Sequence, residues 1–349
     1  MRTATNPQHR KHCHTRGFSL VEMMVAMTIG LALLTVLALL FANSSRAQKE
    51  ITMSAQQVEN GRYALELLSD NLRHAGYYGY YFGLPAASAL VDPCSLTQAD
   101  QRNGIALPIQ GYDSPSSSPL DCIDDANHVP GTDVVVIRRA STVTTASGSL
   151  TGNVFYIQAT ASPNLATNPV VALGSSTSSF NLTVRNGSGA NVAAPIRQLE
   201  THIYFVSPCS NPTGSSNTVC TSTDDGGRPI PTLKRMELTV DSGGATAMVT
   251  YPLVEGIENF QAEYGVDSDN DGAPNGAFLT VPATVADWQN VMAARVYVLA
   301  RNTEMTAGYT DNKTYALGGT TVTPGGQFKR HLYSSVVRIK NQSERREVP

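Results

Sequence analysis

The hydrophobic pattern of the first eighty residues predicts one long helix in two parts. Residues 18–42 are almost continuously apolar, whereas residues 43–76 are polar but keep apolar or small positions three or four residues apart. The positions of this second stripe are Ile51, Ala55, Val58, Leu65, Leu68, Leu72 and Ala75. Neither part contains a proline, and Gly76 follows the last periodic position, where a helix commonly ends. We therefore expect a helix from about Phe18 to Ala75.

The apolar part of this helix is long enough to cross a membrane. At about 1.5 Å per residue, residues 18–42 extend roughly 37 Å, against about 30 Å for the hydrocarbon core of a bilayer. Residues 1–17 before it contain several basic side chains and no acidic one. Because positive flanks stay in the cytoplasm, the sequence predicts a single membrane pass with the rest of the chain outside.

The remainder of the chain, residues 77–349, alternates short β-rich runs with turn residues. Clusters of Ser, Gly, Asn, Asp and Pro separate these runs, as in sheets built from short strands. The runs are VVVIRRA (134–140), NVFYIQA (153–159), PVVAL (169–173), FNLTV (180–184), THIYFV (201–206), LKRMELTV (233–240), AMVTYPL (247–253), ARVYVLA (294–300) and SSVVRIK (334–340). We expect an α+β protein, with a mostly antiparallel β head packed on the second part of the helix.

Other segments of the head are expected to be irregular. Residues 84–132 read as a long, partly irregular loop, and residues 141–152 and 208–228 read as surface loops. A short helix around Ala286–Met292 is expected before the strand at Arg295–Ala300.

The charge balance argues against a nucleic-acid-binding protein, and the absence of catalytic motifs argues against an enzyme. The net charge is −3 and only 15% of residues are charged, which gives the head no electrostatic reason to bind nucleic acid. The chain contains no nucleophile elbow, no HExxH run, no P-loop and no dinucleotide fingerprint. We therefore expect no catalytic activity and no required cofactor.

Four of the five cysteines form two sequence-local pairs. Cys94 and Cys122 bracket one loop, and Cys209 and Cys220 bracket another, whereas Cys13 lies in the basic N-terminal segment. Four cysteines allow three pairings. We favour the two local ones, because each would close a loop rich in turn residues. Disulfides would imply an oxidising compartment, and the spacings fit no zinc motif.

A run of alternating carboxylates offers a candidate metal site. Asp267, Asp269 and Asp271, followed by Gly272, reproduce the first half of a calcium-binding loop. The closing bidentate Glu is missing, because the twelfth position is Phe278. Two interpretations stay open: Ca²⁺ bound with help from other oxygen donors, or an acidic, solvated turn.

One carboxylate, that of Glu22, lies inside the apolar run. A charge there costs about 2.5–3.5 kcal/mol on membrane-insertion scales, and no Lys or Arg within the run can pair with it. The run is too long for the apolar region of a secretory signal peptide, and neither a signal peptide nor a simple signal anchor would explain this charge. Cleavage between Gly17 and Phe18 would supply a partner, because the new α-amino group would lie one helical turn from Glu22 or face the Glu22 of a neighbouring subunit.

The string Gly17-Phe18-Ser19-Leu20-Val21-Glu22 resembles the type IV prepilin cleavage motif at every position. The resemblance implies that a membrane peptidase cuts after Gly17 and methylates Phe18. It also implies that Glu22 pairs with the N-terminal ammonium of a neighbouring subunit during assembly. The expected organisation is a cleaved leader (1–17), a membrane and assembly helix (18–42), an amphipathic helix (43–76) and a β-rich head (77–349).

Three blocks of the head resemble the PilW family of type IV minor pilins. They are Gly61-Arg62-Tyr63-Ala64 to Tyr77, Val254-Glu255-Gly256-Ile257-Glu258-Asn259-Phe260-Gln261 to Asp267, and Arg330-His331 to Lys340. The resemblance implies a pilin-like fold and a minor pilin that primes pilus assembly at the tip, in twitching, adhesion or DNA uptake. The implied partners are other minor pilins, the major pilin, the prepilin peptidase and the inner-membrane assembly platform.

The same resemblance implies a single-pass inner-membrane protein with a periplasmic head, later carried to the cell surface in the pilus. Two alternatives stay open. One is a J-type pseudopilin of a type II secretion system, and the other is a membrane-tethered binding module or adhesin that never polymerises.

Overall fold

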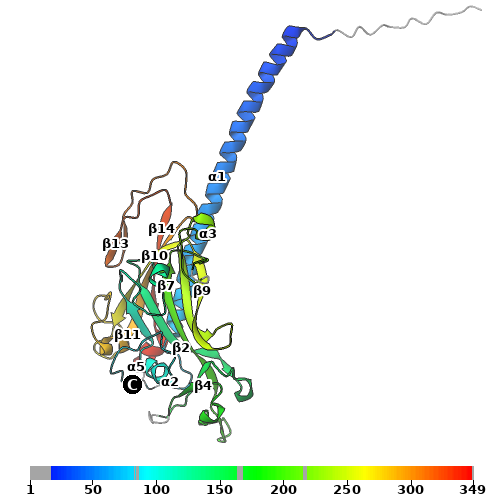
Figure 1. Ribbon diagram of the computed structural model, residues 1–349. Coiled ribbons are helices and arrows are strands. Elements are labelled where there is room, and N and C mark those ends of the chain that lie inside the picture. Colours follow the sequence, from blue (N-terminus) through cyan, green and yellow to red (C-terminus); the bar gives the residue numbers. More distant parts are fainter. Residues whose placement is uncertain (1–16, 82, 84–85, 163–167, 215–217, 348–349) are drawn as a thin grey trace, which may run out of the picture. The chain divides into compact units, whose positions relative to one another are not determined.

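The computed structural model describes residues 17–81, 83, 86–162, 168–214 and 218–347 (Figure 1). The chain divides into two compact units, Met1–Thr52 and Met53–Pro349. The boundary falls inside the predicted amphipathic segment 43–76. Residues 1–16 of the expected leader, which include Cys13, lie outside the described residues.

Helix α1, Leu20–His74, confirms the predicted long helix. Residues 17–52, which include the first part of α1, are exposed, apart from a half-buried Gly30. From Met53 onward one face is buried, and its members are Met53, Gln57, Gly61, Ala64, Leu68, Ser69, Asn71 and Leu72. The second half of α1 is therefore part of the head.

The buried face of α1 differs from the predicted stripe near its start. Ile51, Ala55 and Val58 are exposed, whereas Met53 and Gln57 are buried. The polar Gln57 can occupy a core position because its amide donates to the carbonyl oxygens of Ala300 and Lys329, at 2.8 and 2.9 Å. The predicted stripe was wrong here, since it admitted only apolar or small residues.

Antiparallel sheets make up most of the head. The larger sheet has seven strands: β1 (Ile109–Tyr112), β2 (Val134–Thr145), β7 (Ile196–Ser207), β3 (Phe155–Gln158) and β4 (Val170–Leu173) in that order, with β8 (Thr232–Val240) and β9 (Thr246–Glu255) extending from β7. The smaller sheet has the order β10 (Ile257–Val266), β11 (Val291–Arg301) and β14 (Arg330–Arg338). Two hairpins complete the pairing: β5 (Thr183–Arg185) with β6 (Asn191–Ala193), and β12 (Tyr315–Leu317) with β13 (Thr320–Val322).

Short helices occupy several connections and follow the last strand. They are α2 (Gln98–Gly104), α3 (Asp224–Gly227), α4 (Val285–Gln289) and α5 (Lys340–Glu347), with 3-10 turns η1 (Asp125–Asn127), η2 (Ser147–Ser149) and η3 (Thr177–Ser179). Helix α4 confirms the helix expected before β11. Thr284 begins it with a capping box, in which its hydroxyl accepts from the Asp287 N–H and the Asp287 carboxylate accepts from the Thr284 N–H.

The main core joins α1 to both sheets. Leu68 and Leu72 of α1 belong to the same buried cluster as Ile137 of β2, Phe260 of β10 and Val298 of β11. All five side chains are at most 1% exposed. The predicted α+β class, with an antiparallel head packed on the helix, is therefore confirmed.

Several parts of the fold were not predicted, among them strands β6, β12 and β13 and helix α5. The segment 84–132, expected to be irregular, contains α2 and β1, and β2 continues to Thr145 in a segment expected to be a loop. Strand β10 also went unassigned, because polar Asn259, Gln261 and Glu263 interrupt its apolar residues. These side chains are buried and hydrogen-bonded: Gln261 donates to Asn259, and Glu263 accepts from the Tyr297 hydroxyl.

Candidate functional site: the N-terminal segment and its head

The predicted cleavage bond lies in an open segment just before α1. Gly17 and Phe18 precede the helix, and Phe18 is 90% exposed. A Cβ built on Gly17 would have no neighbouring atom within 4 Å. Among the described residues, nothing therefore blocks access to the Gly17–Phe18 bond.

Glu22 has a local partner that sequence reasoning missed. Its Oε2 accepts a hydrogen bond from the Ser19 N–H at 2.9 Å, which satisfies a backbone donor at the start of α1. The carboxylate also lies in the first turn, where the helix dipole favours negative charge. The Ser-x-x-Glu spacing from Ser19 to Glu22 is a capping signal that could have predicted this contact.

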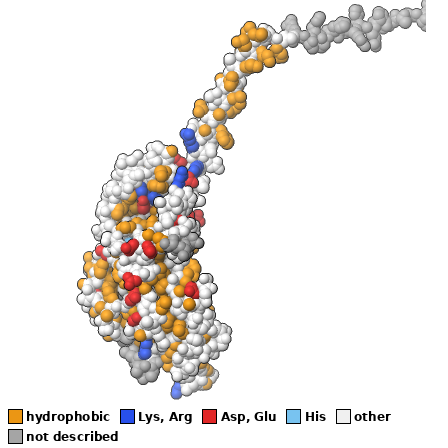
Figure 2. All heavy atoms as spheres, viewed as in Figure 1, with side chains coloured by type: hydrophobic (Ala, Val, Ile, Leu, Met, Phe, Trp, Pro, Cys, Tyr) orange, Lys and Arg blue, Asp and Glu red, His pale blue; other side chains and the backbone are white. Residues whose placement is uncertain are grey.

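The first part of α1 exposes an apolar surface. Figure 2 shows hydrophobic side chains along its length, and sixteen large ones between Phe18 and Phe41 are at least 50% exposed. Its hydroxyls are satisfied within the helix, since Thr28 donates to the Val25 carbonyl and Thr35 to the Leu31 carbonyl. Among the described residues, α1 alone is long and apolar enough to cross a membrane. This helix fits a membrane-anchored pilin.

Both sequence-local disulfides are present in the head. Cys94 pairs with Cys122, and Cys209 pairs with Cys220. The second bridge lies beside Asp224, but its sulfurs are bonded to each other and are not free thiolates for a metal.

The three aspartates of the predicted calcium loop come together, and one of them already forms an ion pair with an arginine. A carboxylate oxygen from each of Asp267, Asp269 and Asp271 lies within 4.8 Å of the others. Asp267 is fully buried, accepts from three backbone N–H groups of its own loop, and receives Arg346 of α5 at 2.8 Å. Burial alone would raise the pKa of Asp267, but these donors hold it below its ordinary value. Arg346 thus stands where a cation would bind Asp267, and calcium binding stays a prediction.

Two of the blocks that resemble the PilW family meet in a buried ion pair. Arg330, whose side chain is 2% exposed, donates to both oxygens of Glu258, and Arg301 lies 3.6 Å from the same carboxylate. Arg330 Nη1 also contacts the fully buried carboxylate of Asp311 at 2.9 Å. The network ties the 302–329 segment to the smaller sheet.

Two family models match the chain. Residues 218–341 match the type IV pilus-assembly protein W family, PilW, and residues 13–38 match the prokaryotic N-terminal methylation motif. The second match contains Gly17, Phe18 and Glu22, and the first contains the aspartate loop and the Arg330–Glu258 pair. Comparison with curated proteins and with solved structures gave no match.

Proposed function

We propose that this chain, a pilin-like type IV pilus assembly protein that matches the PilW family, is a minor pilin that primes pilus assembly at the fibre tip. The observation that supports this role most directly is the methylation motif at the start of an exposed apolar helix that continues into a folded head. Such a helix can be stored in a bilayer and then buried among the same helices of neighbouring subunits. The proposed role needs no catalytic residue and no cofactor.

The proposed assembly step depends on Glu22. In the uncleaved chain its carboxylate caps α1 through the Ser19 N–H. Cleavage after Gly17 would create an ammonium at Phe18, next to that cap. In an apolar helix bundle, this carboxylate and the ammonium of a neighbouring subunit would neutralise each other, which removes the roughly 2.5–3.5 kcal/mol cost of an unpaired charge.

Substitutions at Gly17 and Glu22 separate processing from assembly. We expect Gly17→Val to retain the leader, which mass spectrometry of the purified chain would detect. Glu22→Ala should be processed normally but incorporated poorly into sheared pili, measured by immunoblot. Glu59→Ala is the matched control, because this exposed acid lies on α1 outside the apolar run. Loss of the leader at the same bond in Gly17→Val would contradict the prepilin mechanism.

Gene deletion distinguishes the minor-pilin role from the two alternatives, a J-type pseudopilin and a tethered binding module. We expect loss of surface pili with normal secretion of hydrolases. Normal pili with hydrolases retained in the periplasm would instead identify a J-type pseudopilin. Unchanged pili and secretion, together with a silent Glu22→Ala, would favour a tethered binding module. The size of the head, which with the end of α1 spans Met53–Pro349, favours the pilus, because J-type heads are generally smaller.

A further inference from the structure

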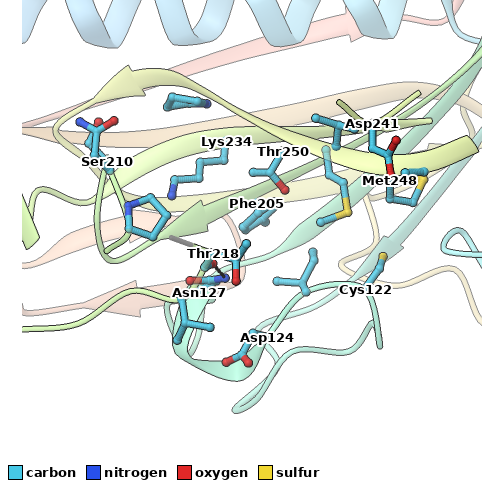
Figure 3. A pocket seen from close by; sticks show the side chains of 18 of the residues that line it. Cys122, Asp124, Asn127, Phe205, Ser210, Thr218, Lys234, Asp241, Met248 and Thr250 are labelled. Atoms are coloured by element: carbon cyan, nitrogen blue, oxygen red, sulfur yellow. Dashed lines mark hydrogen bonds between the residues drawn. The ribbon is translucent and has the colours of Figure 1, made fainter. Parts of the chain in front are cut away.

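A cavity of about 640 Å³ opens in the head between the larger sheet and two loops (Figure 3). Strands β8 and β9 form one side, and the segments 121–127 and 210–212 contribute to the other. The volume falls within the range of about 300–1,000 Å³ typical of small-molecule sites. The cavity is remote in sequence from the N-terminal segment that carries the proposed assembly chemistry.

Lys234 of β8 lines this cavity with an unpaired ammonium. The residue is only 3% exposed, and no hydrogen bond or ion pair joins its nitrogen to a described residue. The nitrogen itself keeps contact with solvent through the cavity. In the sheet, Lys234 is opposite Phe205 of β7 on one side and Pro252 of β9 on the other. Figure 3 shows its side chain extending into the cavity. Because this ammonium has no protein partner and reaches the cavity from an otherwise buried side chain, it is a ready site for an anion.

The two carboxylates that raise the pKa of Lys234, those of Asp224 and Asp225, are engaged elsewhere. Asp224 accepts hydrogen bonds from the backbone and hydroxyl groups of Thr213 and Thr221. Asp225 accepts from the N–H groups of Ser210, Asn211 and Ile230. Burial lowers the pKa of Lys234 to about 8, while these two carboxylates act in the opposite direction, so the ammonium prevails at pH 7.

The other charged groups that line the cavity are exposed aspartates. Asp124 and Asp241 accept from backbone N–H groups of their own turns, and Asp121 is also exposed. Apolar side chains also line the cavity: Ile123, Phe205 and Met236 are buried, and Met248 is half-buried. A single buried cation within an apolar wall fits a ligand with one anionic group and an apolar body.

We propose that this cavity binds a small amphipathic carboxylate, with the carboxylate on the Lys234 ammonium and the apolar body against Phe205, Met236 and Met248. A carboxylate fits better than a phosphate, because Lys234 is the single cationic residue that lines the cavity among the described residues. A phosphate dianion would call for more donors than this one ammonium supplies.

The test uses the full chain in lipid nanodiscs and 4-phenylbutyrate as the probe, with binding followed by saturation-transfer NMR. We expect saturable binding to the wild type and at least about tenfold weaker binding to Lys234→Met, as for the loss of one charge-assisted contact. Lys313→Met, which removes an exposed lysine, is the matched control and should bind like the wild type. Lipid partitioning of the probe is common to all three samples.

Neutral and charged analogues test the ligand class. We expect 4-phenylbutanol and 4-phenylbutylamine to bind at least about tenfold more weakly than the carboxylate, since neither pairs with an ammonium. Equal binding of the carboxylate to wild type and Lys234→Met, or of the alcohol and the carboxylate to the wild type, would overturn the proposal. Displacement of the probe by millimolar inorganic phosphate would also overturn it, in favour of a phosphate site.

Discussion

Replacing Arg330 with Met would test the energetic role of the buried ion network. The change leaves the Asp311 carboxylate, which is fully buried, without its cation. Breaking a buried pair in this way costs about 3–5 kcal/mol. Two donors remain on Asp311, the Tyr315 hydroxyl at 3.0 Å and the Lys313 N–H at 3.2 Å, so we expect the lower end, about 3 kcal/mol. At roughly 2–4 °C per kcal/mol, Tm should fall by about 6–12 °C.

The pH dependence of this loss has a definite sign. Burial alone would raise the pKa of Asp311, but the hydrogen bond from Arg330 and the other donors hold it below its ordinary value. A lowered pKa contributes stability above the unfolded-state pKa, near 4, and that contribution disappears as the pH falls through the folded-state value. The deficit of Arg330→Met should therefore be largest at neutral pH and should shrink on acidification.

Thermal unfolding followed by circular dichroism measures both effects. Arg185→Met is the matched control, because Arg185 is exposed on β5 and should leave Tm unchanged. Adding Asp311→Asn to Arg330→Met should recover part of the loss, since it removes the unpaired charge. A Tm for Arg330→Met within about 2 °C of the wild type, or a further fall in the double variant, would refute the reasoning.

Three further predictions follow from buried contacts. Gly111→Ala places a Cβ 2.0 Å from the Tyr264 hydroxyl oxygen and should lower the free energy of unfolding, measured by chemical denaturation, by about 1–3 kcal/mol. Adding Tyr264→Phe should recover part of this loss. An unchanged stability of Gly111→Ala would contradict the predicted clash. Arg346→Gln removes the cationic partner of the Asp267 carboxylate. The Tm of this variant should be lower than that of the wild type in EDTA and should rise more on addition of millimolar Ca²⁺. If Ca²⁺ does not change its Tm, the hypothesis of calcium binding at this loop is wrong. Because the pKa of Lys234 is lowered to about 8, its ammonium destabilises the fold below that pH and ceases to do so as the pH approaches 10.5. Lys234→Met should therefore exceed the wild type in free energy of unfolding by about 1–2 kcal/mol at pH 7, after allowance for solvent in the cavity, and the difference should shrink towards pH 10.5. An advantage that does not change with pH would contradict the assignment.

The sequence predicts best where one local pattern dominates. Helix α1 and the nine β-rich runs repeat apolar residues at helical or strand spacing, so their existence could be predicted without knowing their partners. Gln57 and strand β10 could not, because their polar side chains are acceptable in the core only through partners far away in sequence. Gln57 needs the carbonyls of Ala300 and Lys329, and Gln261 needs the Gly131 carbonyl.

The same limit applied to the candidate sites. The processing motif and the aspartate loop are contiguous strings, and each could be recognised within a few residues. The Glu258–Arg330 pair depends on the order and register of β10, β11 and β14, which sequence periodicity does not fix. Lys234 belongs to a run that predicts an ordinary strand, and only the packing around the cavity reveals that its side chain is buried and that its ammonium faces the cavity without a partner.

The hydrogen bonds from α1 to the head have a mechanical consequence. Gln57 contacts the end of β11, the central strand of the smaller sheet, and Asn71 donates to the Tyr204 hydroxyl of β7 in the larger one. Between these two anchors the buried face of α1 packs on both sheets. A pull along the helix axis would therefore load many contacts at once, in shear, instead of peeling them away one by one. The second half of α1 acts as a tether that shares tension between the two sheets.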